Sequence, residues 1–222
     1  CFIESLDKEI NILVATSGDT GSAVAHGFYG LKGVNVTILY PKGKVSDIQE
    51  KQLTTLDKNI YALEINGSFD DCQTLVKTAF LDDSLRSKIH LSSANSINIA
   101  RLIPQSFYYA YSYLQIENKH MPTVFSVPCG NFGNITAGLI AKKMGLPVHQ
   151  FIASTNLNDV VPNYLKTGEY DPKPSIPTIS NAMDVGDPSN MARIMNMYTN
   201  IEELQSDMIS WSFDENETSN MI

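Results

Sequence analysis

Short apolar runs alternate with amphipathic segments along the first half of the chain. Three runs are rich in β-branched and other apolar residues, as is typical of strands buried on both faces of a parallel sheet: 10–16, 35–40 and 60–65. The segments that follow them repeat apolar residues at helical spacing, which predicts helices at 21–33, 46–57 and 68–80. The last two begin with a serine suited to capping a helix, and Ser46 forms a capping-box pattern with Gln49. This alternation with short connections predicts right-handed crossovers and a parallel sheet.

The same alternation returns in the second half, after a polar loop at 90–98 and a long predicted helix at 99–118. We expect strands at 123–128 and 147–154, and helices at 135–145, 160–166, 188–198 and 201–208. The Pro- and Ser-rich segment 170–188 predicts a long loop.

The predicted fold class is α/β, with two lobes of mostly parallel sheet flanked by helices. We expect residues 1–95 to form a smaller lobe that carries the Ser17–Gly21 loop. Residues 96–122 are expected to form a loop and a long connecting helix. Residues 123–222 are expected to form part of a larger lobe that carries the Gly130–Asn134 loop.

Composition and charge exclude several classes of function but add little about the fold. Hydrophobic residues make up 43% and charged residues 18% of the 222, which is ordinary for a globular chain. A net charge of −8 repels phosphate backbones, so we expect neither nucleic acid nor an anionic membrane as a partner. The three cysteines form no disulfide or metal-binding pattern, which favours a reducing cytoplasm. Because the chain opens on Cys1 and ends within a polar helix-forming stretch, we expect a piece of a longer protein.

The loop Gly130–Asn134 is the strongest chemical signal. It joins a predicted strand to a predicted helix, and free N–H groups at a helix N-terminus favour an anion. Its glycines allow the backbone to approach a ligand closely. No lysine follows at the spacing of a nucleotide-binding loop, and no G-x-G-x-x-G occurs. An anion site and an ordinary glycine-containing turn are equally compatible with these residues.

Two further loops offer polar groups. Ser17–Gly21 supplies hydroxyls and a carboxylate at the end of a strand, where ligands bind in open α/β sheets, although Asp19 could simply cap the next helix. The segment 92–101 packs three serines, two asparagines and Arg101 into ten residues. Hydroxyl, amide and guanidinium groups suit a phosphate ester, although the segment taken alone is better explained as an ordinary polar loop in which Asn95 caps a helix.

Other candidates are weaker. Cys129 lies beside the glycine loop, but no nucleophile motif surrounds it and a small buried residue is the better interpretation. The four histidines show no metal-binding spacing, so we expect no metal.

Six stretches taken together resemble the threonine synthase family: ATSGDTGSAVAHGF, ILYPKGKVS, FDDCQTLVK, SANSINIARL, PCGNFGN and SNAMDVGDPSN. The similarity covers roughly residues 9–200 in the right order. It implies a fold-type-II enzyme that uses pyridoxal 5'-phosphate (PLP). It also implies conversion of O-phospho-L-homoserine and water into L-threonine and phosphate.

The resemblance also implies roles for individual residues. The loop that binds the cofactor phosphate corresponds to Gly130, Asn131, Phe132, Gly133 and Asn134, and Asp19 is placed beside the ring hydroxyl of the cofactor. The loop facing the substrate carboxylate corresponds to Ser17, Gly18 and Thr20. The groups that hold the substrate phosphate correspond to Asn95, Ser96 and Arg101.

The lysine that forms the Schiff base in this family lies in a Phe-Lys-Asp segment expected upstream of Cys1, so we assign no catalytic residue to this chain. The segment that contacts the pyridine nitrogen is expected beyond Ile222. We therefore expect the chain to need the remaining segments of the full-length protein for activity. A related phospho-lyase that forms no threonine, and a non-catalytic phosphate-binding module, remain alternatives.

Overall fold

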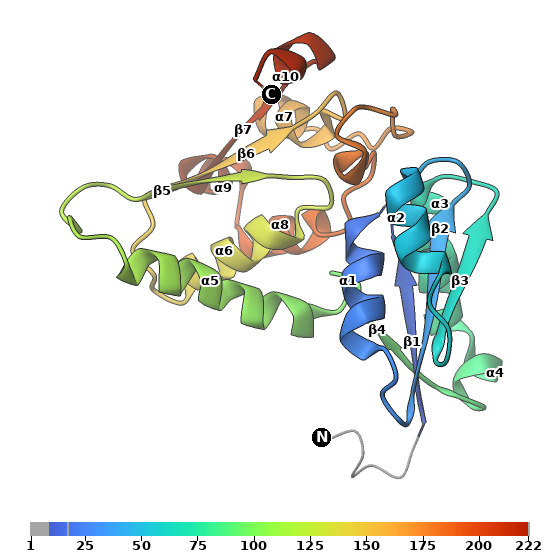
Figure 1. Cartoon of the computed structure of the whole chain (residues 1–222). Coiled ribbons are helices and arrows are strands. Elements are labelled where there is room, and N and C mark those ends of the chain that lie inside the picture. The colour runs from blue at the N-terminus through green and yellow to red at the C-terminus, as the bar shows by residue number, and fades with distance from the viewer. Residues whose placement is uncertain (1–8, 17, 222) are drawn as a thin grey trace. The chain divides into compact units, whose positions relative to one another are not determined.

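A computed structural model describes residues 9–16 and 18–221 (Figure 1). The chain divides into two compact units, Cys1–Asn95 and Ser96–Ile222. Ser17, one of the predicted site residues, lies outside the described residues.

The first unit is built on four parallel strands, which confirms the predicted parallel sheet. In sheet order these are β3 (Ile60–Ile65), β2 (Val34–Pro41), β1 (Ile10–Ala15) and β4 (His90–Ser93). The buried residues Val14, Val36 and Ile38 form the centre of its core. Its helices are α1 (Asp19–Phe28), α2 (Asp47–Thr54), α3 (Phe69–Leu81) and α4 (Asp83–Arg86).

The chain adds strands first to one side of β1 and then to the other, so the strand order reverses at β1 although all strands are parallel. The chain steps from β1 to β2 to β3 and then crosses back to place β4 on the other side of β1. Right-handed crossovers therefore put α1 and α2 on one face and α3 on the other, as Figure 1 shows. The carboxyl ends of β1 and β4 flank this reversal, which is where ligands bind in open α/β sheets.

The second unit contains three parallel strands in the order β5 (Val124–Pro128), β6 (Gln150–Thr155) and β7 (Met208–Ser212). Its larger helices are α5 (Leu102–Leu114), α6 (Gly133–Lys143), α7 (Val160–Thr167), α8 (Met191–Met197), α9 (Ile201–Asp207) and α10 (Glu215–Met221). Two short 3-10 turns are also present, η2 (Ile99–Arg101) and η3 (Asn181–Met183). The core packs Phe151 of β6 against Tyr109 and Phe125, with ring centroids 5.5 and 6.0 Å away. Met191 and Ile194 of α8 are fully buried beside them.

The long loop before α8 is ordered by a buried asparagine pair at the end of β6. Asn156 Nδ2 donates to Thr178 Oγ1 and to Asp184 Oδ1, both at 2.8 Å. Asn158 accepts from the backbone N–H of Ile176 at 2.7 Å. Burial raises the pKa of Asp184. The segment 170–188 is therefore a loop, as predicted, and the side chains of Asn156 and Asn158 hold it by hydrogen bonds.

Four elements differ from the sequence-based expectation. The strands β4 and β7 and the short helix α4 were not predicted, and the predicted helix 99–118 is a 3-10 turn followed by α5, which ends at Leu114. β4 has mostly polar side chains and is a strand because Ile10–Leu13 of β1 pairs with it along its length. β7 pairs likewise with β6. Among the described residues no helix is long and apolar enough to cross a membrane.

Candidate functional site

The glycine loop of the second unit leads into helix α6 with its N-terminus uncapped by a side chain. Phe132 occupies the N-cap position in the left-handed conformation, with φ 58°, and makes no side-chain capping hydrogen bond. No acidic residue lies in the first turn of α6, and Lys142 and Lys143 lie in its last turn. The first N–H groups of this helix thus present a partial positive charge suited to an anion.

The two glycines of this loop permit close packing within the protein. A Cβ atom at Gly130 would lie 2.8 Å from Met183 Cα, and one at Gly133 would lie 3.0 Å from Ser96 Cβ. Real Cβ contacts are longer, so a larger residue would displace these segments. Glycine is therefore required at both positions by packing within the protein, in addition to any close approach of a ligand.

The remaining loop side chains are held by the protein. Phe132 is buried in the core of the second unit. Tyr109 Oη donates to Asn134 at its backbone oxygen and at Oδ1, over 3.1 and 2.9 Å. Contacts from this loop to an anion therefore come from its backbone N–H groups.

Asn131 connects the loop to Ser96, one of the predicted substrate-binding residues. Its Nδ2 donates to Ser96 Oγ at 3.0 Å. Its Oδ1 accepts from the backbone N–H of Ser189 at 2.7 Å and from Ser189 Oγ at 3.0 Å. The predicted cofactor-phosphate loop and Ser96 are thus joined directly by a side chain.

Two residues that the sequence analysis did not single out complete this cluster. Asn190 is fully buried, and its Nδ2 donates to Ser96 Oγ and to the backbone oxygen of Asn131, both at 2.8 Å. Arg193 donates to Asn190 Oδ1 at 2.8 Å, to the backbone oxygen of Ser96 at 2.9 Å and to that of Ile97. Both residues lie in the segment 188–198, for which the sequence predicted a helix and no binding role.

Arg101 lies at the end of the 3-10 turn η2, directly before α5. It is half-buried, and burial lowers the pKa of its guanidinium group. An arginine remains protonated at neutral pH even so. Arg101 therefore supplies a permanent, partly desolvated cation to this end of the second unit.

In the first unit, the loop between β1 and α1 is organised by Thr16. Its buried Oγ1 accepts from the N–H groups of Gly18 and Gly21, both at 2.9 Å, and donates to the backbone oxygen of Gly18 at 3.0 Å. Gly18 has φ 150°, a conformation that strains any other residue. Thr20 is half-buried in the first turn of α1.

Asp19 is not the N-cap of α1, because Gly18 occupies that position and Asp19 is the first residue of the helix. Its exposed carboxylate instead accepts from Gln49 Nε2 of α2 at 2.9 Å. The capping alternative for Asp19 is therefore wrong, while its predicted contact with a cofactor ring stays a prediction.

Asn95 lies at the end of β4 with its side chain directed at the end of β1. Its Oδ1 accepts from the backbone N–H of Ala15 at 2.7 Å, and its Nδ2 donates to the Ala15 oxygen at 2.6 Å. Asn95 and Ala15 are both buried. The amide thus extends the pairing of β1 and β4 by one residue and fixes the loop that follows each strand.

Both described cysteines are buried thiols. Burial raises the pKa of Cys72 to about 11, and it raises the pKa of Cys129 further. A thiol so protonated is a poor nucleophile, which confirms the interpretation of Cys129 as a small buried residue. Within the described ranges no group of three or more His, Cys, Asp or Glu residues could hold a metal ion.

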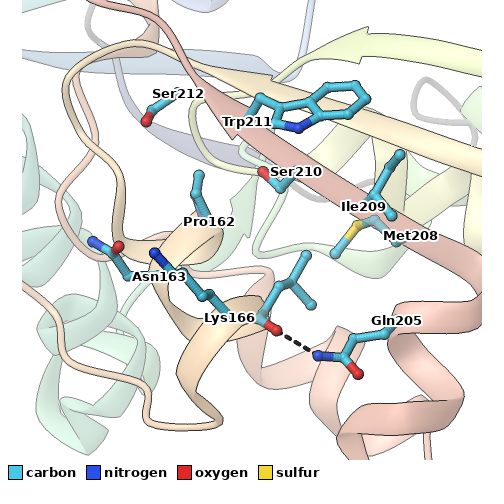
Figure 2. Close-up of a pocket in the computed structure, with 10 residues that line it drawn as sticks. Pro162, Asn163, Lys166, Gln205, Met208, Ile209, Ser210, Trp211 and Ser212 are labelled. Atoms are coloured by element: carbon cyan, nitrogen blue, oxygen red, sulfur yellow. Dashed lines mark hydrogen bonds between the residues drawn. The ribbon is translucent and has the colours of Figure 1, made fainter.

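A separate pocket of the second unit lies where β7 meets α7 and α9 (Figure 2). Asn163 and Lys166 of α7 and Ser210 and Trp211 of β7 are among the residues that line it. None of the predicted site residues lines this pocket. It is therefore distinct from the Ser96–Asn131 cluster.

Comparison with known proteins decides the family. Residues 3–215 match the family described as "Pyridoxal-phosphate dependent enzyme". The chain belongs to this family. Its two parallel sheets flanked by helices are the partial structure expected of a fold-type-II member.

Within this family the chain is similar to threonine synthases. The threonine synthase of Haemophilus influenzae is 55% identical over 209 residues, 92% of this chain and 49% of that protein. The crystal structure of threonine synthase from Escherichia coli matches with a TM-score of 0.91 and 46% identity, over 97% of this chain and 51% of that one. PLP-bound threonine synthase from Brucella melitensis matches with a TM-score of 0.81 and 34% identity, over 98% of this chain and 52% of that one. The chain thus spans about half the length of the relatives it matches.

Proposed function

We propose that the protein containing this chain is a threonine synthase, which converts O-phospho-L-homoserine and water into L-threonine and phosphate. The observation that supports this most is the 55% identity to a threonine synthase over 92% of the chain. Under this proposal the chain supplies groups that bind the cofactor phosphate and the substrate. The remaining part of the protein supplies the Schiff-base lysine and the contact to the pyridine nitrogen.

The residues present fit the phosphate group of PLP. The uncapped N-terminus of α6 offers the N–H groups of Gly133, Asn134 and Ile135 without a competing side chain or a nearby first-turn carboxylate. These N–H groups would hold the cofactor phosphate. When bound, PLP supplies an electron sink for carbanion chemistry at the substrate. No Phe-Lys-Asp occurs in the 222 residues, so the lysine that would carry the cofactor is assigned to no residue of this chain.

Ser96 and Arg101 would hold the substrate phosphate, the leaving group of the reaction. Arg101 would offer a charge-assisted hydrogen bond, which is roughly twice as strong as a neutral one. Asn95 would act on this site through its bonds to Ala15, which fix the chain entering Ser96.

The loop of the first unit would face the substrate carboxylate. The N–H groups and hydroxyls of Ser17, Gly18 and Thr20 are the groups proposed for this contact. Asp19 is proposed to lie beside the ring hydroxyl of PLP, and its bond from Gln49 would orient the carboxylate.

Product analysis tests this proposal. The purified full-length protein, supplied with PLP and O-phospho-L-homoserine, should release threonine and phosphate in equal amounts. A control with L-homoserine, which lacks the phosphate, should release no threonine. Phosphate without threonine would instead identify a phospho-lyase, and release of neither would favour a non-catalytic phosphate-binding module.

A further inference from the structure

The hydroxyl of Ser96 is surrounded by two amide groups whose orientation is fixed. Asn131 Oδ1 accepts from the backbone N–H of Ser189, so the Nδ2 of Asn131 must face Ser96. Asn190 lies between Arg193, which only donates, and the Asn131 carbonyl, which only accepts. Its Nδ2 must therefore also face Ser96.

This arrangement decides the role of the Ser96 oxygen. A serine hydroxyl has two acceptor lone pairs and one proton to donate. Both lone pairs are taken, by Asn131 Nδ2 at 3.0 Å and by Asn190 Nδ2 at 2.8 Å. The proton must then point away from both amides. Within the second unit as described, no hydrogen bond from this proton to another residue is present.

We propose that Asn131 and Asn190, with Asn190 held by Arg193, are positioning residues that make Ser96 a dedicated hydrogen-bond donor to the substrate phosphate. This inference rests on the proposed function, because that function places the phosphate at Ser96. An oxygen that only donates suits an anion that only accepts. Arg193 stabilises the arrangement twice, through Asn190 Oδ1 and through the backbone oxygens of Ser96 and Ile97.

The test replaces one hydrogen-bond donor beside Ser96 with an acceptor while keeping the shape of the side chain. In Asn190→Asp a carboxylate oxygen replaces Nδ2, so the Ser96 proton is drawn to residue 190 and away from the phosphate. The measurement is the Kd of inorganic phosphate for the PLP-loaded full-length protein, by titration calorimetry. PLP loading keeps the cofactor-phosphate site filled. The exposed variant Asn118→Asp has the same charge change and keeps its acceptor for the His120 N–H, so it is the matched control.

Ser96→Ala should weaken phosphate binding by about ten- to hundredfold, the effect of losing a hydrogen bond to a charged group. Asn190→Asp should weaken it at least as much, and Asn118→Asp should leave it unchanged. In the Ser96→Ala background the effect of Asn190→Asp should shrink to that of its charge alone, because no hydroxyl remains to reorient. A merely structural role for Asn190 predicts the same weakening in both backgrounds, and that result, or an unchanged Kd in Ser96→Ala, overturns the inference.

A second variant covers the case in which Asn190→Asp does not fold. Asn131→Asp reverses the other amide at a half-buried position, and the same dependence on Ser96 is expected. Threonine formation by the unmodified protein separates the two claims. If the protein forms threonine but shows no coupling, only the positioning role fails. If it shows coupling but forms no threonine, only the proposed function fails.

Discussion

The asparagines of the predicted site are hydrogen-bonded mainly to the protein itself. Asn95 pairs with both backbone groups of Ala15, and Asn131 bridges Ser189 and Ser96. Amides carry a donor and an acceptor on one rigid plane, so they can fix two neighbours at once. At this scale the groups proposed to bind ligands are supported by residues that orient them.

We expect Asn95→Ala to destabilise the first unit. The change leaves the buried N–H and C=O of Ala15 without their side-chain partners, at a cost of about 2–6 kcal/mol for two buried groups. Amide hydrogen exchange at Ala15 and the thermal unfolding of the full-length protein measure this. The exposed Asn118→Ala is the control, and an Ala15 amide that stays equally protected would contradict the structural role of Asn95.

Arg101→Ala should weaken O-phospho-L-homoserine binding far more than PLP binding. A charge-assisted contact is worth about 1.5–3 kcal/mol, so KM should rise by roughly ten- to hundredfold. Arg101→Lys, which keeps the charge but not the planar fork, should recover part of the loss. Arg86→Ala, which removes an exposed guanidinium paired with Asp83, should have no effect. An unchanged KM in Arg101→Ala would remove this residue from the substrate site.

The sequence could indicate these residues only where they form a local pattern. Ser96 and Arg101 stand in one polar stretch of ten residues, and the glycine loop directly precedes a helix. Asn190 and Arg193 lie more than ninety positions from Ser96, at separations of 94 and 97, and reach it only through folding. Their side chains are ordinary in composition, so no spacing along the chain points to that contact.

Individual helices of the first unit are fixed by capping boxes. Both predicted serine caps are confirmed, at Ser46 with Gln49 and at Ser68 with Asp71. In the second box the Ser68 N–H donates to Asp71 Oδ2 at 2.7 Å, and Ser68 Oγ donates to the same oxygen at 2.8 Å. These bonds lower the pKa of Asp71, the backbone bond contributing most.

Ser68→Ala should lower the free energy of unfolding by about 0.5–2 kcal/mol at pH 7. The lowered pKa means that the folded state favours the ionised carboxylate. This stabilisation is therefore present above the ordinary pKa of 3.8 and is lost as pH falls through the lower folded pKa. The difference between wild type and variant should shrink between pH 7 and pH 3 in denaturant titrations. A difference that is the same at both pH values would argue against the capping box, and Ser84→Ala on the exposed face of α4 is the control.

Elements with strong local signals were predictable, and those made by pairing were not. The apolar runs of β1, β2 and β3 and the helical periodicity of α3 indicated their structure directly. β4 reads His-Leu-Ser-Ser and is a strand because β1 offers it an unpaired edge. β7 follows α9 without a break, so the sequence gives no signal where the helix ends.

At the scale of the whole molecule, this chain contains two α/β units and about half the length of its relatives. Topology, rather than any single residue, fixes two features of the units. These are the point in the first sheet at which the strand order reverses, and the start of α6 in the second unit. The strand–helix alternation predicted parallel strands and right-handed crossovers, but not the strand orders, because each sheet contains a strand that was not predicted, β4 or β7. The hydrogen bonds that hold Ser96, one of the groups proposed to bind a ligand, could be seen only in the structure.

The source of the threonine hydroxyl tests the proposed reaction most directly. The phosphate of O-phospho-L-homoserine sits on the γ carbon, whereas the hydroxyl of threonine sits on the β carbon. A threonine synthase must therefore take that hydroxyl from water and release phosphate with its bridging oxygen. With the full-length protein, PLP and ¹⁸O-labelled water, mass spectrometry should find one label in each threonine formed and none in the phosphate. Label in the phosphate, with homoserine as the organic product, would show simple hydrolysis at phosphorus and contradict the account.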